Sequence, residues 1–581
     1  GGGTGADRFV DPGNPNIGNG GGGGGAGLGG AVFVRQGAAV NFIDGEISGN
    51  TVAGGLGAVG GGPAQPNASG GNGGAIGQGM FLAGAASYTV TAGNTVTVAD
   101  SIGGGVDAQI TGGFTKAGDG TLTLSSLANN YAGTTTVTGG TLRLDAPGAI
   151  GAGPVVVQAS LSPARLIVNA SQTVASLASP GGGETQINHS AIFAVNAGAS
   201  STYNGSISGD GTLRKIGPTA LTLGGTQANS IFLEIQQGSV DLAKTGGPGA
   251  VAAQFVFGLP PGTSLRLAGS ILDDQVADSG GITLNGGVLD LNGRPETVNF
   301  LLGTGVVTSN GVFPGTMRFN GSGLLPSTDL NFQDGTSPVR LIKQGGSAAR
   351  LTGTLDHSYT EVAAGTLELV GQTVRDMTVR DAARLALLPL SAGATRFTGV
   401  TTVDAGGQID ATSGGAVFAP GTESTVRAWL VQGYNNGDWT GAGLTSSVAA
   451  LTPQNDGMGY GLASEVLGIG PGQTTEFLGK TVGPDDVLAA YTMSGDANLD
   501  RIVDIGDFSA LAANFNSSGN WVHGDFTYDG TTGIEDFAVL AVNFNQTLPR
   551  TSLAAAVPEP GTAASAAGSV ALLLRRRRCS M

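Results

Sequence analysis

The chain of 581 residues almost lacks cysteine and histidine. Its one cysteine, Cys579, lies near the end, so an intrachain disulfide is excluded. Its three histidines, His189, His357 and His523, lie far apart in the sequence. Catalysis that depends on histidine is therefore not expected.

Charge is also scarce, and it is biased to one sign. Charged residues make up 12% of the chain, and the formal net charge is −16. Nucleic-acid binding requires a basic surface that neutralises phosphates. The composition therefore argues against a nucleic-acid partner and suits a surface that meets calcium outside the cell.

Glycine, in contrast, is abundant, with 106 residues, and apolar residues make up 40% of the chain. Apolar residues alternate with threonine, serine and glycine, which is typical of ordered β-strands joined by tight turns. Near the start, Ala31–Val34 and Val40–Ile43 are short apolar runs bounded by glycine. They resemble the Gly-rich β-helix repeats of bacterial surface proteins, with a flexible linker as the alternative for residues 1–25. The opening residues contain no export signal, so we expect the N-terminus to be incomplete.

A repeating strand pattern is clearest at residues 114–144. Segments such as Thr121–Leu124, Thr134–Val137 and Thr141–Leu144 alternate polar and apolar residues, and Gly or Asn supplies the turns between them. The stretch resembles the autotransporter-associated β-strand repeat of passenger domains. The resemblance implies a right-handed parallel β-helix over about residues 80–400 and no enzyme activity.

Weaker copies of this repeat follow at 213–242 and 341–369. In each copy a lysine precedes the last strand at a similar spacing, and these lysines are Lys116, Lys215 and Lys343. The repetition favours a solenoid whose coils stack on one another.

Acidic residues concentrate in a segment that begins at Asp496. A calcium loop places oxygen ligands at positions 1, 3, 5, 7, 9 and 12, with a backbone carbonyl at position 7. Position 6 is Arg501, where glycine is usual, so we expect strain in the turn. The pattern predicts calcium (Ca²⁺) bound by Asp496, Asn498, Asp500, the Ile502 carbonyl, Asp504 and Asp507.

The same pattern recurs after Asp525. Gly530 restores the expected turn at position 6, and water would replace a side chain at Gly533. An apolar helix follows each loop, at Phe508–Phe515 and at Phe537–Phe544. The duplicated loop and helix resemble a type I dockerin, and an acidic loop without metal is the alternative. The second set of predicted calcium ligands is Asp525, Thr527, Asp529, the Thr531 carbonyl and Asp536.

The C-terminal tail combines Pro558, Glu559 and Pro560, an apolar stretch at 561–574, and four arginines. As a helix the apolar stretch would reach about 21 Å, short of a bilayer core of about 30 Å. The order of these features resembles the PEP-CTERM sorting signal, which implies recognition and cleavage by an exosortase. An ordinary basic tail is the alternative. The residues expected to flank the membrane on its cytoplasmic side are Arg575, Arg576, Arg577 and Arg578.

These patterns predict a mainly β chain, in which a right-handed parallel β-helix precedes a small α-helical dockerin-like domain and a short membrane segment. We expect an exported, non-catalytic structural or adhesive protein of the cell surface. Its partners would be an exosortase-type enzyme and exopolysaccharide or other surface components. The expected divisions are a Gly-rich β-helix-like start at 1–80, a solenoid at 81–400, a β-rich capping module at 401–490, the dockerin-like domain at 491–550 and the sorting tail at 551–581.

Two other functions fit parts of the sequence. A polysaccharide lyase or hydrolase would use carboxylates such as those of residues 272–278. A component of a cohesin-based assembly would use the dockerin-like domain. Cohesin contacts commonly involve hydroxyl side chains at loop positions 10 and 11, whereas this chain has Ile505-Gly506 and Ile534-Glu535 there. A cohesin partner is therefore disfavoured.

Overall fold

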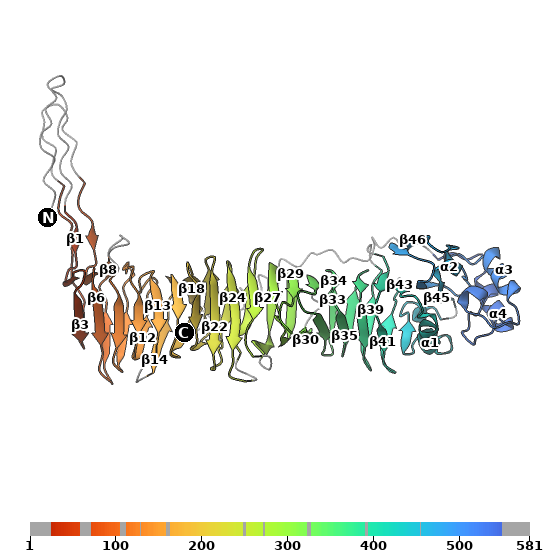
Figure 1. The fold of residues 1–581 in the computed structure, drawn as a ribbon, viewed down its shortest axis with the longest axis horizontal. Helices are drawn as coiled ribbons and strands as arrows, with labels where there is room; N and C mark the ends of the chain where they lie inside the picture. Colours follow the sequence, from red (N-terminus) through yellow and green to blue (C-terminus); the bar gives the residue numbers. More distant parts are fainter. Residues whose placement is uncertain are drawn as a thin grey trace, which may run out of the picture. The chain divides into compact units, whose positions relative to one another are not determined.

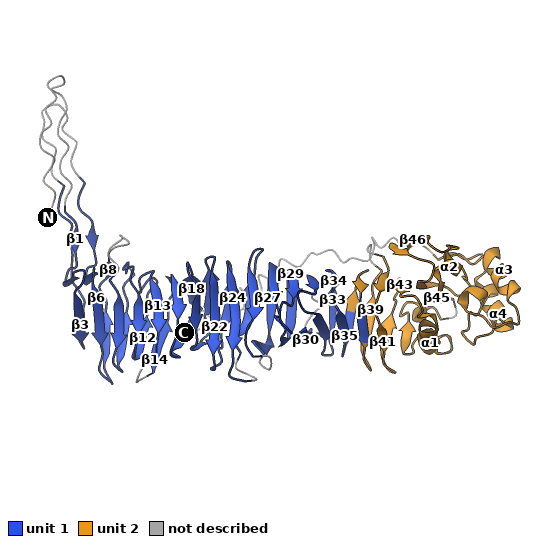
Figure 2. Ribbon diagram, viewed as in Figure 1, with its two compact units in different colours: residues 1–367, 375–378 blue, residues 368–374, 379–581 orange. Residues whose placement is uncertain are grey.

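The computed structural model describes residues 25–57, 71–104, 112–127, 129–158, 163–247, 251–270, 274–321, 327–389, 393–453 and 455–548. A β-solenoid of about 14 turns spans residues 80–417, and a mixed α/β region follows it (Figure 1). The predicted mainly β solenoid is thus confirmed, and its handedness stays a prediction. The chain divides into two compact units, residues 1–367 with 375–378 and residues 368–374 with 379–581 (Figure 2).

The first half of the first unit is built from parallel strands that stack in register. Two six-stranded sheets have the orders β20-β17-β14-β12-β10-β7 and β16-β13-β11-β9-β6-β3. The short strands near the start of the described chain pair in parallel as β1–β4 and β2–β5–β8. Their bounds are β1 Gly27–Leu28, β2 Val32–Val34, β3 Ala39–Ile43, β4 Ala75–Ile76, β5 Met80–Leu82, β6 Ala85–Thr89, β7 Thr95–Val98, β8 Ile102–Gly104, β9 Phe114–Ala117, β10 Thr121–Leu124, β11 Thr135–Val137, β12 Gly140–Leu144, β13 Pro154–Val157, β14 Ala164–Val168, β16 Ser176–Ala178, β17 Glu184–Ile187 and β20 Ser206–Ser208.

The rest of the first unit continues the parallel stack. One long sheet runs from β15 through β34, and a second face carries β28-β30-β32-β35. The bounds are β15 Gln172–Val174, β18 Ile192–Asn196, β19 Ser201–Tyr203, β21 Thr212–Ile216, β22 Ala220–Gly225, β23 Phe232–Ile235, β24 Ser239–Lys244, β25 Ala253–Gly258, β26 Ser264–Leu267, β27 Val276–Asp290, β28 Pro295–Val298, β29 Phe300–Thr308, β30 Gly315–Phe319, β31 Ser327–Gln333, β32 Val339–Lys343, β33 Ala348–Leu351, β34 Leu355–Asp356 and β35 Tyr359–Val362; β36 Thr366–Leu369 and β38 Asp376–Val379 lie where the units divide.

Buried and exposed side chains alternate along each strand, and the buried ones form the core of the solenoid. In β12, Leu142 and Leu144 are fully buried, whereas Arg143 between them is exposed. The parallel register places Leu122, Leu142 and Leu166 directly above one another on β10, β12 and β14. Each buried leucine contributes about 1.5–3 kcal/mol of hydrophobic stabilisation. The core is therefore a set of columns of stacked aliphatic side chains.

Glycine is required at the tight bend before β12. Gly140 has φ +58°, and a Cβ atom there would lie 2.4 Å from the Gly120 carbonyl oxygen and 2.5 Å from that of Gly118. Neighbouring coils approach too closely at this bend for any side chain. The contact explains why β12 begins with glycine.

A fully buried lysine lies in the coil of the first repeat copy. The Lys116 Nζ donates hydrogen bonds to the carbonyl oxygens of Ala117 at 2.8 Å, Gly118 at 2.7 Å and Gly139 at 3.1 Å. Three ammonium protons thus meet three acceptors, two at their own bend and one in the next coil. Burial lowers the pKa of Lys116 to about 8.

The two weaker copies repeat this arrangement. The Lys215 Nζ donates to the carbonyls one and two residues ahead and to that of Gln237 at 3.2 Å. The Lys343 Nζ does the same, and its acceptor in the next coil is the Ala364 carbonyl at 3.3 Å. Burial lowers the pKa of both lysines to about 8. The lysine spacing in the sequence therefore reports a recurring three-dimensional contact between coils.

The parallel stack ends in the second unit. Strand β43 (Gly415–Phe418) pairs antiparallel with β48 (Val487–Met493), and β48 pairs antiparallel with β45 (Asp456–Leu462). The remaining elements are β37 Thr373–Val374, β39 Arg384–Leu387, β40 Thr395–Phe397, β41 Thr401–Val403, β42 Gln408–Asp410, β44 Gly443–Thr445, β46 Thr475–Phe477, β47 Lys480–Val482, α1 Glu423–Tyr434, η1 Asn435–Gly437, η2 Ala449–Leu451, α2 Ala463–Val466, α3 Ile505–Ala513, η3 Trp521–His523 and α4 Ile534–Asn543.

The region after the solenoid contains a helix that the sequence reading missed. We expected a β-rich module at 401–490, but the solenoid reaches residue 417 and α1 follows it. Val426, Trp429, Leu430 and Gly433 are the buried residues of α1, at the helical spacing i, i+3, i+4 and i+7. This period was present in the sequence and could have predicted the helix.

Two of the predicted segments fall wholly or partly outside the described residues. The sorting tail, with Pro558, Glu559, Pro560 and the arginines at 575–578, lies outside them, as do residues 1–24. Among the residues that the structure does describe, no helix is both long enough and apolar enough to cross a membrane.

Candidate calcium-binding loops

The two loops predicted to bind calcium are loop 1 (residues 496–507) and loop 2 (residues 525–536). Loop 1 closes on its two end carboxylates. Asp496 Oδ2 accepts the N–H of Arg501 at 2.8 Å, and Asp496 Oδ1 accepts the N–H of Asp500 at 3.2 Å. At the other end, Asp507 Oδ1 accepts the N–H of Ala497 at 2.8 Å, and its Oδ2 accepts that of Asp504 at 2.8 Å. Both carboxylates are almost fully buried.

Loop 2 repeats most of this network at its ends. Asp525 Oδ2 accepts the N–H of Gly530 at 3.0 Å. Asp536 Oδ1 accepts the N–H groups of Phe526 at 2.8 Å and Thr527 at 2.9 Å, and its Oδ2 accepts that of Gly533 at 2.8 Å. The duplication seen in the sequence is thus a duplication of structure.

Position 6 has a left-handed backbone in both loops. Arg501 has φ +73°, and Gly530 has φ +92°. A left-handed conformation costs a non-glycine residue about 1–2 kcal/mol. The strain that the sequence predicted at Arg501 is therefore present, and loop 1 closes in spite of it.

The carboxylates in the middle of each loop accept hydrogen bonds from backbone N–H groups of the same loop. Asp500 Oδ1 accepts the N–H of Ile502 at 2.9 Å, and in loop 2 Asp529 Oδ1 accepts that of Thr531 at 2.8 Å. Asp504, the predicted ligand at position 9, is the N-cap of α3 and accepts the Gly506 N–H at 2.6 Å. Its carboxylate is thus used to begin the helix.

Asn498, the remaining predicted side-chain ligand of loop 1, is turned toward the same segment. Its Oδ1 accepts the N–H of Asp500 at 2.9 Å, and its Nδ2 donates to Asp500 Oδ2 at 3.0 Å. The side chains at positions 3 and 5 of this loop therefore lie beside each other, and each has an oxygen atom that can bind a cation.

Burial and mutual repulsion make these carboxyl groups hard to ionise. Desolvation raises the pKa of Asp496 to about 7, and the neighbouring Asp507 and Asp500 add to the rise. Desolvation likewise raises the pKa of Asp525 to about 6, with Asp536 as the next cause. A bound cation would offset both effects, since it stabilises the ionised form.

Loop 2 contains buried oxygen atoms that lack a partner. Asp525 Oδ1 and Thr527 Oγ1 are buried and have no hydrogen-bond partner among the residues that the structure describes. They occupy loop positions 1 and 3, and a hard cation such as Ca²⁺ binds carboxylate, hydroxyl and carbonyl oxygens. Within the described ranges, no group of three or more His, Cys, Asp or Glu side chains converges to hold a metal ion. The oxygen donors at positions 1 and 3 are of the type that calcium prefers, and calcium binding stays a prediction.

A helix follows each loop, as the sequence predicted, and the two helices pack against each other. The rings of Phe508 on α3 and Phe537 on α4 lie 6.2 Å apart in an edge-to-face contact. Both helices begin three residues earlier than expected and end before Phe515 and Phe544, which are exposed. The small helix pair thus leaves part of its apolar surface uncovered.

The loops are joined to the α/β region that precedes them. Tyr528 donates its hydroxyl to the Met458 carbonyl on β45, and Asn543 Nδ2 donates to the Asn455 carbonyl at 3.2 Å. Asn543 Nδ2 donates to the Ser494 carbonyl at 2.8 Å. These contacts make the loop and helix pair part of the second unit.

Each first-position carboxylate is also held by a side chain from outside its loop. Thr492 on β48 donates its hydroxyl to Asp496 Oδ2. Arg427 on α1 donates to Asp525 Oδ2 at 3.3 Å and to the Tyr528 carbonyl at 3.2 Å. Sequence reasoning missed both residues. Arg427 precedes Asp525 by 98 positions, and no local motif marks a contact at that separation.

Comparison with known proteins identifies one short part of the chain. Residues 114–144 match the family described as Passenger-associated-transport-repeat, which is the stretch that contains Lys116. No curated protein and no solved structure matches the chain. The repeat is consistent with an exported, surface-associated passenger protein.

Proposed function

We propose that this chain is an exported, non-catalytic passenger protein of the cell surface, with a structural or adhesive role. The observation that carries the proposal is the passenger-associated repeat at 114–144 within a solenoid of about 14 turns. Solenoids of this kind expose long, regular surfaces on which function depends on display rather than on one catalytic centre.

Fractionation of the producing cells tests this proposal. Antibody against the solenoid should label intact cells, and protease added outside should remove the label. The purified chain should release no unsaturated sugars from a panel of polysaccharides. Intracellular protein, or such release, would contradict the surface role or its non-catalytic character respectively.

Calcium binding by the dockerin-like loops is the second part of the proposal. It is supported by the matching hydrogen-bond networks and by the unpartnered oxygens Asp525 Oδ1 and Thr527 Oγ1. Extracellular calcium modules bind at roughly 10⁻⁴–10⁻³ M. Addition of calcium to the chelated full chain should therefore raise the melting temperature of the second unit in that range, and magnesium should serve as the control ion. An unchanged melting profile would reject calcium.

Sorting by the tail is the third part, and it rests on the sequence alone. An exosortase-type enzyme would recognise Pro558, Glu559 and Pro560 and remove the arginine cluster. Mass spectrometry of the extracellular protein should then find a C-terminus upstream of Arg575. An intact Arg575–Met581 end on that protein would argue against sorting.

A docking role for the helix pair is the second candidate function. Ile505 and Ile534, at position 10 of the two loops, are 65% and 62% exposed. Equivalent exposed apolar residues on a duplicated surface suit a protein partner, although a cohesin is disfavoured because its contacts commonly involve hydroxyl side chains at this position. A pull-down with the full chain tests this, and the matched variant carries Ile505→Asp and Ile534→Asp.

A further inference from the structure

Arg501 occupies a position where its side chain is costly. Its backbone is left-handed, while the equivalent residue of loop 2 is glycine. Closure of the loop uses only the backbone N–H, which Gly530 supplies to Asp525 just as Arg501 supplies it to Asp496. The cost of about 1–2 kcal/mol is therefore not explained by the loop.

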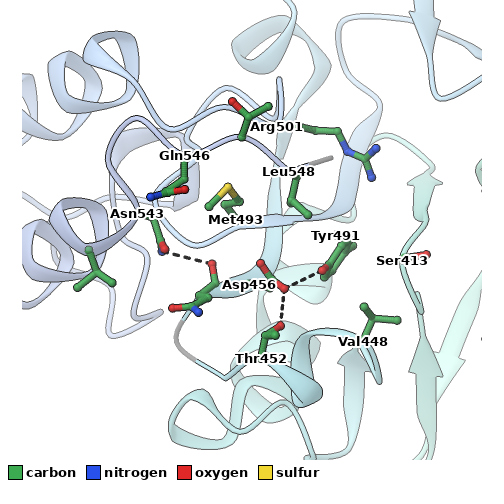
Figure 3. A pocket seen from close by; sticks show the side chains of 13 residues that line it. Ser413, Val448, Thr452, Asp456, Tyr491, Met493, Arg501, Asn543, Gln546 and Leu548 are labelled. Carbon is green, nitrogen blue, oxygen red and sulfur yellow. Dashed lines mark hydrogen bonds between the residues drawn. The ribbon is translucent and has the colours of Figure 1, made fainter. Parts of the chain in front are cut away.

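The Arg501 side chain lines a cavity in the second unit. This cavity has a volume of about 630 Å³, and Figure 3 shows Arg501 and Tyr491 on one side with Asn543 and Gln546 on the other. A smaller cavity of about 200 Å³ shares Ser413, Tyr491 and Arg501 with it. Arg501 thus lies at the wall between two adjoining spaces, large enough together for a small polar ligand.

The guanidinium group of Arg501 is available to a ligand. Within the described part of the chain it makes no hydrogen bond and no ion pair. A guanidinium recognises a carboxylate through paired, charge-assisted hydrogen bonds. The one carboxylate of the cavity wall, that of Asp456, accepts the hydroxyls of Tyr491 and Thr452 and forms no ion pair with Arg501. A ligand carboxylate can therefore pair directly with the guanidinium group.

The rest of the cavity wall is suited to hydroxyl groups. Asp456 Oδ2 accepts the hydroxyls of Tyr491, at 2.7 Å, and of Thr452, which fixes the carboxylate and the ring (Figure 3). Gln546 adds an amide that both donates and accepts. A carboxylate so near the ligand disfavours a doubly charged phosphate and tolerates a single charge balanced by Arg501.

We propose that this cavity binds an acidic saccharide, that is, a sugar ring bearing one carboxylate. The carboxylate would pair with Arg501, the apolar face of the ring would lie on Tyr491, and the hydroxyls would bond with Asp456 and Gln546. The site gives the proposed surface role a ligand class, and the solenoid and the calcium loops do not depend on it.

Calorimetric titration of the full chain in calcium tests this site with three probes. D-Galacturonate carries ring and carboxylate, D-galactose the ring alone, and acetate the carboxylate alone. We expect galacturonate to bind at least about tenfold more tightly than either, because only it uses both halves of the site. Absence of galacturonate binding, or equal binding of acetate, would overturn the proposal.

Arg501→Gly supplies the matched variant. Glycine suits the left-handed backbone, so the melting temperature should stay equal or rise, which excludes misfolding as a cause. Galacturonate binding should weaken about 10- to 100-fold, while the weak binding of galactose should not change. Retention of galacturonate affinity in Arg501→Gly would refute the role of this residue, and Tyr491→Ala should weaken both sugars.

Discussion

The buried lysine of the first repeat allows a quantitative test of how the coils are joined. In Lys116→Met the side chain keeps its length and loses its ammonium group. Three charge-assisted hydrogen bonds disappear, and the Gly139 carbonyl in the next coil is left without a donor. Such bonds contribute about 1.5–3 kcal/mol each.

The loss is partly offset, because methionine does not have to be desolvated. Burying an ammonium group costs several kcal/mol even in a relaxed protein. Two of the three acceptors lie at a part-buried bend and can bond to water instead, whereas Gly139 is in a buried contact. We therefore expect a net local destabilisation of about 3 kcal/mol, equivalent to about a 150-fold change in the opening equilibrium.

Hydrogen–deuterium exchange with mass spectrometry measures this change coil by coil. Each coil contacts chiefly its neighbours, so exchange should accelerate at residues 114–144 and not around Lys343, which keeps its own three acceptors. The exposed Arg143→Met is the control, with an expected effect within about 0.5 kcal/mol. Unchanged or slower exchange at 114–144 would show that the lysine is not a net stabilising contact.

Three further predictions follow from the described residues. Gly140→Ala should destabilise the solenoid by about 3 kcal/mol or more in thermal unfolding, whereas Gly93→Ala, which has φ +84° and open space around it, should cost about 1 kcal/mol. Burial lowers the pKa of His357 to about 4; the unfolded chain therefore binds more protons than the folded chain between pH 6.5 and 4, so stability falls as the pH drops through that window, by about 3 kcal/mol in urea titrations. His357→Gln should remove this dependence, and a pH profile equal to that of the wild type would refute it. Asp525→Asn should abolish calorimetric calcium binding at loop 2 and spare loop 1, and undiminished stoichiometry would contradict the assigned ligand.

The sequence alone predicted the features that repeat or that are local. The strands of the first repeat were visible because side chains alternate along each strand, and β10 has the predicted bounds. The lysine spacing could be recognised because the lysine of each repeat copy makes the same contact with the next coil. The two loops could be predicted because all the ligand positions of each loop lie within twelve consecutive residues.

Contacts that occur once, between distant segments, were decided only by the tertiary structure. Nothing local in the sequence shows that Arg427 reaches Asp525, that β48 pairs with β43 at the end of the stack, or that Arg501 and Tyr491 line one cavity. A periodic contact leaves a period in the sequence, whereas a single long-range contact leaves none. The sequence by itself therefore determined the repeated coils and the two acidic loops. Only the tertiary structure decided which distant segments contact them.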